Sequence, residues 1–289
     1  MNSCLKTGVI HCDDNKNVLA EIPSNCIDLI YLDPPFFSNK TYEVIWGDEA
    51  EVRSFDDRWE GGIQVYTAWM RERAQELHRV LKPTGSLYLH CDWHANAYLK
   101  VMMDSIFGAN PRGNDKGFQN EIVWCYEVGG RGKNRWARKH DTILFYAKGK
   151  KFHFDWTAVA EPRKPGTHMR AKIDEDGREY QEKTDSKTEK VYRYYVDEGT
   201  IPPDWWIGPQ QLNREAAERI GYPTQKPEAL LEKIIAASSR RRHRSRPILR
   251  LRNGDSGGAQ ARPGMAWHRH QPNGARHCAA ALGEDRRNG

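Results

Sequence analysis

Four consecutive residues, Asp33-Pro34-Pro35-Phe36, place a carboxylate, a carbonyl and an aromatic ring on a stiff piece of backbone. Each proline fixes its own φ, lacks an N–H and disfavours helix in the residue before it, so the segment is extended and cannot continue a sheet ladder. The Asp33 carboxylate and the Pro34 carbonyl are therefore left as acceptors beside the Phe36 ring. A flat heterocycle with an exocyclic amine needs this set: two acceptors for its two N–H donors and a ring on which to stack.

A buried strand is expected to position these four residues. Residues 27–33 (IDLIYLD) are apolar and β-branched with no polar alternation after Asp28, which is typical of a strand covered on both faces in a parallel sheet. The prolines end that strand at Asp33. The loop that follows lies at the carboxyl edge of the sheet, where open α/β folds bind their ligands.

The quartet at the end of this strand resembles the catalytic motif of amino-group methyltransferases, above all the DNA adenine-N6 and cytosine-N4 enzymes, whose pattern is Asp/Asn/Ser-Pro-Pro-Tyr/Phe/Trp. The resemblance implies transfer of a methyl group from S-adenosylmethionine to the amine of a base flipped out of duplex DNA. Phe36 would stack on the base, while Asp33 and the Pro34 carbonyl accept its amine hydrogens. Asp at the first position favours adenine-N6, and cytosine-N4 is the alternative. An ordinary strand-to-loop turn is the simpler interpretation of the motif alone.

The next elements predict a doubly wound α/β fold. A helical pattern over residues 61–81 is followed by Lys-Pro-Thr-Gly, an apolar strand over residues 86–91 and a helix over residues 95–108. The same order occurs in the resembled family. We therefore expect a Rossmann-like methyltransferase sheet in permuted order, with the catalytic motif before the cofactor motif.

Two segments are candidates for binding the cofactor. A short strand near residues 9–12 leads into a helix starting near Asn15, and Asp14 matches the family's acidic residue that accepts hydrogen bonds from adenosine. A helix cap is the alternative role for Asp14. The second segment resembles the one that precedes the cofactor loop, and its helix N-terminus and donors suit the carboxylate of S-adenosylmethionine. Its candidate residues are Thr224, Gln225, Lys226 and Pro227.

A Gly-rich loop between two predicted strands (residues 122–126 and 142–147) is basic and contains Trp136. Basic side chains mixed with an aromatic ring favour contacts to a nucleic-acid backbone, with a solvated charged hairpin as the alternative. The candidate residues are Arg131, Lys133, Arg135, Arg138 and Lys139. The irregular stretch from residue 150 to about residue 211 fits neither the sheet nor a plain linker, so residues 112–212 together are assigned to target recognition.

The C-terminal tail does not match the rest of the chain. From Arg240 onward it holds twelve Arg, no Lys and three acidic residues, a net +9, which leaves −3 for residues 1–239 out of the overall +6. The family requires a strand and then Asp-Pro-Phe-x-Gly-x-Gly-Thr, but the tail has no strand pattern and no Gly-x-Gly. The domain hypothesis is a catalytic half (1–111), the target-recognition region (112–212), a cofactor-flanking motif and helix (213–239), and an aberrant, disordered tail (240–289) that replaces the cofactor half.

A change of reading frame near Ser239 explains this tail. Arg241 to Asn253 can be encoded by a nucleotide sequence that, read one base later, gives Gly-Asp-Ile-Val-Leu-Asp-Pro-Phe-Cys-Gly-Cys-Gly-Thr. The segment Trp267 to Asn273 likewise can hide Gly-Ile-Asp-Ile-Asn-Pro, which is close to the family's next strand. We therefore expect weak or absent cofactor binding by this chain.

The remaining features limit the other functions. His90, Asp92 and His94 alternate like metal ligands, but the strand ends near Cys91 and amino-group methylation needs no metal, so no metal is predicted. The chain has no long apolar run and no secretory signal, so we expect a cytoplasmic protein without membrane contact. The predicted partners are double-stranded DNA and a cognate restriction endonuclease. Methylation of RNA or of protein glutamine, and a catalytically dead DNA-binding remnant, are the rival functions.

Overall fold

The computed structural model describes residues 10–12, 14–46, 51–127, 133–163, 171–212, 216–218, 224–239, 248–252 and 264–267. For residues 10–12, 41–46, 51–56, 248–252 and 264–267, only the course of the backbone is considered below.

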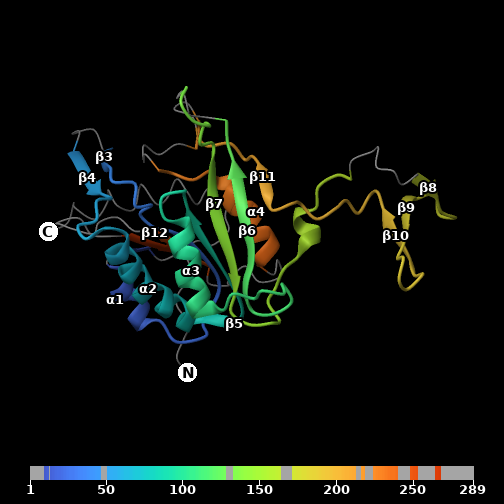
Figure 1. Ribbon diagram of the computed structural model, residues 1–289, viewed down its shortest axis with the longest axis horizontal. Coiled ribbons are helices and arrows are strands. Elements are labelled where there is room, and N and C mark those ends of the chain that lie inside the picture. Colours follow the sequence, from blue (N-terminus) through green and yellow to red (C-terminus); the bar gives the residue numbers. More distant parts are fainter. Residues whose placement is uncertain are drawn as a thin grey trace, which may run out of the picture.

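An eight-stranded mixed sheet forms the centre of the molecule (Figure 1), in the order β1-β13-β12-β2-β5-β7-β6-β11. Strand β2, which ends at Asp33, pairs in parallel with β12 on one side and with β5 on the other, and β7 runs antiparallel to both β5 and β6. The strands are β1 (Ile10–Cys12), β2 (Ile27–Asp33), β5 (Leu81–Cys91), β6 (Gly117–Cys125), β7 (His140–Ala147), β11 (Trp205–Ile207), β12 (Ile248–Arg252) and β13 (Gly264–Trp267).

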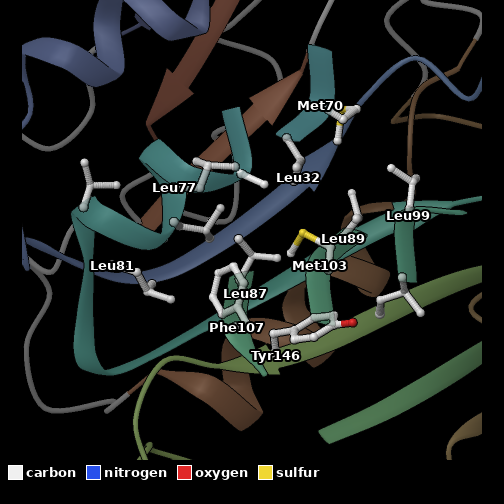
Figure 2. Packing of buried hydrophobic residues seen from close by; sticks show 14 of the residues in the cluster. Leu32, Met70, Leu77, Leu81, Leu87, Leu89, Leu99, Met103, Phe107 and Tyr146 are labelled. Atoms are coloured by element: carbon white, nitrogen blue, oxygen red, sulfur yellow. The ribbon is translucent and has the colours of Figure 1, made fainter. Parts of the chain in front are cut away.

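Helices cover both faces of the sheet. The helices α1 (Asn15–Glu21), α2 (Gly62–Val80) and α3 (Asn96–Phe107) contribute to one apolar cluster, and α4 (Glu228–Ser238) contributes to the other. Strand β2 joins both clusters, because Ile30 and Leu32 belong to the first while Leu29 and Tyr31 belong to the second. Each fully buried Leu or Ile contributes about 1.5–3 kcal/mol. The close packing of β2 and β5 against α2 and α3 (Figure 2) holds the end of β2 in a fixed place.

Smaller elements lie outside this sheet. Strands β3 (Thr41–Trp46) and β4 (Glu51–Asp56) form an antiparallel pair after the catalytic loop. A separate three-stranded sheet contains β8 (Ala171–Ile173), β9 (Glu179–Thr184) and β10 (Val191–Tyr195), and it projects from the main body in Figure 1. A short 3-10 helix, η1 (Trp156–Val159), contacts α4.

The sequence predicted most of the first half of the chain. The structure confirms the strand over residues 27–33 and, within one or two residues, the helices expected over residues 61–81 and 95–108. The expected strand over residues 86–91 forms the second half of β5. The alternation of an apolar strand with amphipathic helices is therefore a sufficient signal for this part of the sheet.

Two expectations about the later part of the chain are wrong. Residues 205–207 form β11 and pair in parallel with β6, although this stretch was judged too irregular for the sheet. The tail was expected to have no strand pattern, yet β12 and β13 both lie in the main sheet, and β12 lies beside β2. A sheet edge offers unpaired peptide N–H and C=O groups, so another segment can pair with it through its backbone alone. The rest of residues 240–289 lies outside the described residues.

Among the helices that the structure describes, none combines the length and the apolar character needed to cross a membrane.

Candidate active site

The four residues of the motif form a buried corner at the carboxyl end of β2. Asp33 is the last residue of the strand, with 5% of its surface exposed, and Pro34 and Pro35 are buried after it. Phe36 is half-buried. A carboxylate in such a place keeps its position because the strand before it is packed on both faces and the prolines after it cannot rotate about φ.

Tyr66 of α2 holds the next part of the corner. Its hydroxyl donates to the carbonyl of Pro35 over 2.6 Å, and the ring is fully buried. Burial raises the pKa of Tyr66, so its hydroxyl stays protonated and available as a donor. The turn after Pro35 is therefore tied to the helix layer rather than only to the strand.

His90 of β5 supports the Phe36 ring. The two rings stack with their centroids 5.4 Å apart and their planes inclined by 29°. His90 Nδ1 lies 2.6 Å from the Tyr31 hydroxyl and Nε2 lies 3.1 Å from a carboxylate oxygen of Asp141. Since a carboxylate only accepts, Nε2 carries the proton and Nδ1 accepts from Tyr31. Asp141 also accepts from the Tyr126 hydroxyl over 3.0 Å, which completes a buried polar network beneath the corner.

Electrostatics keep this histidine neutral. Burial lowers the pKa of His90, and the nearby ammonium of Lys226 lowers it further, while the hydrogen bond to Asp141 acts in the opposite direction. A neutral imidazole at this place adds no positive charge next to the aromatic ring. Among the described residues, Lys226 is the cation that lies over the Phe36 ring.

Lys226 contacts two of the catalytic candidates directly. Its Nζ lies 2.9 Å from Asp33 Oδ1 and 4.7 Å from the centroid of the Phe36 ring, and the residue is 7% exposed. It also donates to the carbonyl of Thr224 over 3.4 Å. The sequence predicts that Lys226 contacts the cofactor carboxylate, whereas in the structure its ammonium pairs with the carboxylate of Asp33.

Asp57 holds the loop after Phe36 and was missed by the sequence analysis. It is 1% exposed, and its two carboxylate oxygens accept from the backbone N–H of Phe37 (3.0 Å) and of Ser38 (2.6 Å). The Ser38 hydroxyl and the Trp59 indole N–H donate to the same carboxylate over 2.7 and 3.1 Å. Phe37 has φ +61°, and these bonds stabilise that uncommon backbone conformation. The surrounding sequence mixes polar and aromatic residues with little periodicity, so no local pattern distinguishes Asp57.

Asp14 acts as a helix cap in the structure. Its Oδ1 accepts from the backbone N–H of Lys16 over 2.8 Å, which is the alternative that the sequence left open. Its carboxylate also binds the Arg73 guanidinium, with distances of 3.0 and 2.8 Å to the two oxygens. Arg73 is 4% exposed and lies over the Trp69 ring, and burial lowers its pKa. Asp14 therefore joins α1 to α2.

The beginning of α4 binds a carboxylate of this chain. Glu218 Oε2 accepts from the backbone N–H of Glu228 over 3.0 Å, and the Gln225 amide donates to the carbonyl of Glu218 over 2.7 Å. Pro227 is the N-cap residue of the helix. The backbone N–H of Glu228 thus binds a carboxylate, as expected for a helix N-terminus. A role of Thr224, Gln225, Lys226 and Pro227 in binding S-adenosylmethionine stays a prediction, and the glycine loop that would hold the rest of the cofactor does not occur in the sequence.

The basic loop candidates lie at the same sheet edge as Asp33. The loop joins β6 to β7, and β7 begins at that edge because it runs antiparallel to β5, with Thr142 opposite Cys91. Lys133, Arg135 and Arg138 are exposed, and Arg138 lies 3.5 Å from the ring centroid of Trp93, which follows β5. Lys139 Nζ donates to the carbonyl of Glu127 over 2.6 Å. Arg131 lies outside the described residues.

The three alternating residues at the end of β5 and just after it have different partners. His90 belongs to the network with Tyr31 and Asp141, whereas Asp92 and His94 pair with each other, 2.8 Å apart. Burial raises the pKa of Asp92. Among the described residues, no group of three or more His, Cys, Asp or Glu could hold a metal ion.

Comparisons with known proteins agree with the motif. A family model described as DNA methylase, of the N6/N4 methyltransferase type, matches residues 27–243. The chain is similar to the type II methyltransferase M.BglII of Bacillus subtilis, with 27% identity over 243 residues, covering 80% of this chain and 56% of that protein. It is also similar to the DNA adenine methyltransferase YhdJ of Escherichia coli K12, with 28% identity over 223 residues, covering 76% of this chain and 64% of that protein. The chain thus spans less than two thirds of the length of either relative.

A solved structure shows the same fold. The cytosine-N4-specific PvuII DNA methyltransferase superposes with a TM-score of 0.51 at 14% sequence identity, covering 82% of this chain and 72% of that chain. The structural likeness thus agrees with the Rossmann-like methyltransferase sheet expected from the sequence. The family model matches more than half of the chain, and S-adenosylmethionine is the methyl donor of this family. The chain therefore belongs to the DNA methylase family of N6/N4 amino-methyltransferases.

Proposed function

We propose that the enzyme from which this chain derives methylates the N6 amine of adenine in duplex DNA. The observation that carries this proposal is the corner at residues 33–36, where a buried carboxylate, a carbonyl and a supported aromatic ring adjoin at the carboxyl edge of the sheet. The proposed partner is double-stranded DNA, with a cognate restriction endonuclease as a second partner. The cytoplasm suits a protein that acts on cellular DNA.

The proposed chemistry is mainly one of position and hydrogen bonding. S-adenosylmethionine supplies an electrophilic methyl group when bound. The target base leaves the duplex stack, at a cost of a few kcal/mol, and stacks on Phe36. Asp33 and the Pro34 carbonyl accept hydrogen bonds from the two N–H groups of its amine. These bonds shift the nitrogen lone pair out of the π-system of the ring and towards the methyl donor. The His90 ring, which is held by Tyr31 and Asp141, packs against the Phe36 ring and limits its movement.

Adenine is the proposed base because the motif begins with Asp. Cytosine-N4 is the second candidate, since it presents the same exocyclic amine to the same two acceptors. Among the relatives, YhdJ is described as an adenine methyltransferase. The likeness to the cytosine-N4 enzyme rests on 14% identity and concerns the fold alone. Analysis of the methylated nucleoside separates the two bases directly.

We further propose that this chain carries a shifted reading frame after about Ser239 and is inactive as it stands. The family match ends at residue 243, and the Gly-x-Gly loop is absent from the tail. The predicted cofactor residues are also engaged elsewhere, Lys226 with Asp33 and the α4 N-terminus with Glu218. The proposed organisation is a catalytic half (1–111), a target-recognition region (112–212), a cofactor-flanking segment (213–239) and an altered tail (240–289).

A frame-restored gene tests the proposal. The coding DNA is sequenced through this region, and the one-base shift must restore an open frame containing the glycine motif. The restored protein is then incubated with radiolabelled S-adenosylmethionine and duplex DNA, RNA or protein. We expect labelled N6-methyladenine in DNA, and we expect Asp33→Ala to abolish it while the fold is retained. Full activity of Asp33→Ala, or labelling of RNA or protein instead, would reject the assignment. DNA binding without any methyl transfer would favour a catalytically dead remnant.

A further inference from the structure

Trp136 is the most exposed large apolar side chain among the described residues. Its relative exposure is 95%, compared with 73% for the next, Ile173 and Ile207. An indole side chain buries 150–250 Å² when covered, and covering a large apolar side chain contributes about 1.5–3 kcal/mol. A tryptophan that is fully exposed to solvent does not gain this burial free energy. A partner that covers the ring would explain why an exposed loop carries it.

The loop that carries Trp136 is anchored beside the catalytic corner. At its base, the backbone N–H of Tyr126 donates to the carbonyl of Lys139 over 3.0 Å. Nearer the tryptophan, the Arg138 guanidinium lies 3.5 Å from the ring centroid of Trp93, and that ring stacks on His94 at 3.7 Å. Strand β7 is separated from β2 by β5 alone, so the loop leaves the sheet roughly 10 Å from the strand of Asp33. Figure 1 shows β6 and β7 running side by side to this loop.

The charge around Trp136 indicates the chemistry of the partner. Residues 133–139 (KNRWARK) contain four basic side chains and no acidic one. An exposed ring among cations suits a partner that has both anionic groups and flat apolar rings, which is the composition of nucleic acid. A protein surface of acidic residues would meet the cations and leave the indole uncovered.

We propose that Trp136 is a wedge that enters the base stack of DNA beside the nucleotide delivered to Asp33 and Phe36. This inference rests on the proposed function, because a base that leaves the duplex opens a gap in the stack. Unstacking that base costs a few kcal/mol, and an aromatic side chain inserted into a duplex contributes about 1–3 kcal/mol of stacking. The basic side chains of the loop hold the phosphates on either side of the gap.

The test uses the chain as it exists and needs neither cofactor nor a known recognition sequence. Binding is measured by fluorescence anisotropy with two short labelled duplexes of the same mixed sequence, one intact and one with a central abasic site. The abasic duplex offers the gap without the cost of flipping. We expect the wild-type chain to bind the abasic duplex roughly 5- to 150-fold more tightly, which corresponds to about 1–3 kcal/mol of stacking.

Three variants make the result specific. Trp136→Ala should lose the preference for the abasic duplex and keep its affinity for the intact one within about 3-fold, whereas Trp136→Phe should retain part of the preference. The matched control is Tyr98→Ala, which removes a 54% exposed aromatic ring from α3 and should leave the preference unchanged. Circular dichroism checks that the variants keep the wild-type fold.

The outcomes separate this inference from the proposed function. If Trp136→Ala keeps the full preference, or if the wild type binds both duplexes equally, the proposed insertion of Trp136 is rejected. The proposal that the protein binds DNA is then retained. If the wild type binds neither duplex, the wedge and the DNA-binding part of the proposed function are both rejected.

Discussion

The ammonium of Lys226 lies 2.9 Å from the carboxylate of Asp33, and the two side chains are only 7% and 4% exposed. The residues are 193 positions apart, so the pair connects the end of the catalytic strand with the segment before α4. The same ammonium lies over the Phe36 ring. It thus occupies two of the contacts that we propose for the target base, which are the hydrogen bond from its amine to Asp33 and the stacking of its ring on Phe36. The base must displace Lys226 from Asp33 or share the carboxylate with it.

Removing this cation is expected to destabilise the protein strongly. Lys226→Met keeps the length of the side chain but leaves the buried Asp33 carboxylate without its cation, at a cost of about 3–5 kcal/mol in the free energy of unfolding. Urea denaturation measures the loss. The control is Lys16→Met, which breaks an exposed pair with Glu72 and should leave the free energy of unfolding nearly unchanged, because solvent screens the pair. Adding Asp33→Asn to Lys226→Met should recover part of the stability, and strictly additive effects would show that the pair is not coupled.

Loss of the Tyr66 hydroxyl is expected to loosen the corner. Tyr66→Phe leaves the buried carbonyl of Pro35 without its donor, which should cost about 1–3 kcal/mol of unfolding free energy. The matched change Tyr98→Phe, at an exposed position on α3, should alter stability by less than about 0.5 kcal/mol. Equal stabilities of the two variants in urea would mean that the hydrogen bond to Pro35 contributes nothing.

His90 is expected to make the protein sensitive to acid. Because burial lowers its pKa, the folded state keeps the ring neutral while the unfolded chain takes up a proton below about pH 6.5. The unfolded state then binds more protons, so the stability present above about pH 6.5 falls as the pH drops, by up to about 1.4 kcal/mol per pH unit. Between about pH 6.5 and 5, His90→Gln should remove the contribution of His90 to the decrease of unfolding free energy with falling pH.

His78 provides the comparison for this slope. Burial and two neighbouring lysines lower its pKa as well, but the ring is packed against Phe107 outside the network of His90. His78→Gln should therefore remove only the contribution of His78 to the pH dependence of the unfolding free energy. The contribution of His90 should remain. The explanation fails if His90→Gln and the wild type show the same dependence of unfolding free energy on pH.

This chain is expected to bind S-adenosylmethionine weakly or not at all. The N-terminus of α4 already holds the Glu218 carboxylate, Lys226 is paired with Asp33, and Asp14 is paired with Arg73. Isothermal titration calorimetry should detect no binding in the micromolar range. The frame-restored chain is the positive control and should bind. Micromolar affinity in the unmodified chain would contradict the proposal that its cofactor half is lost.

The sequence predicted those parts of the site that depend on neighbouring residues. The prolines after Asp33 reveal the end of the strand, and an unbroken apolar run reveals that β2 is buried. The sequence does not predict the roles of three residues, because each acts through a contact with residues between 19 and 59 positions away. These residues are His90, Asp57 and Tyr66. The partner of Lys226 was hidden for the same reason, since only the folded sheet brings residue 226 to residue 33. The sequence predicts a cofactor role for Asp14 and offers the helix cap as the alternative, which can be recognised because capping is a local interaction.

The pairing of β12 with β2 bears on how a chain with an altered C-terminal tail can still complete its sheet. Hydrogen bonds along a ladder are made by groups that every residue except proline carries, so they do not depend on which amino acids the codons specify. A peptide of unrelated sequence can therefore pair with an exposed edge strand of an incomplete sheet. Such pairing hides the backbone groups through which edge strands aggregate. The ladder therefore requires no particular side chain of the tail, whereas binding of the cofactor by the glycine motif would.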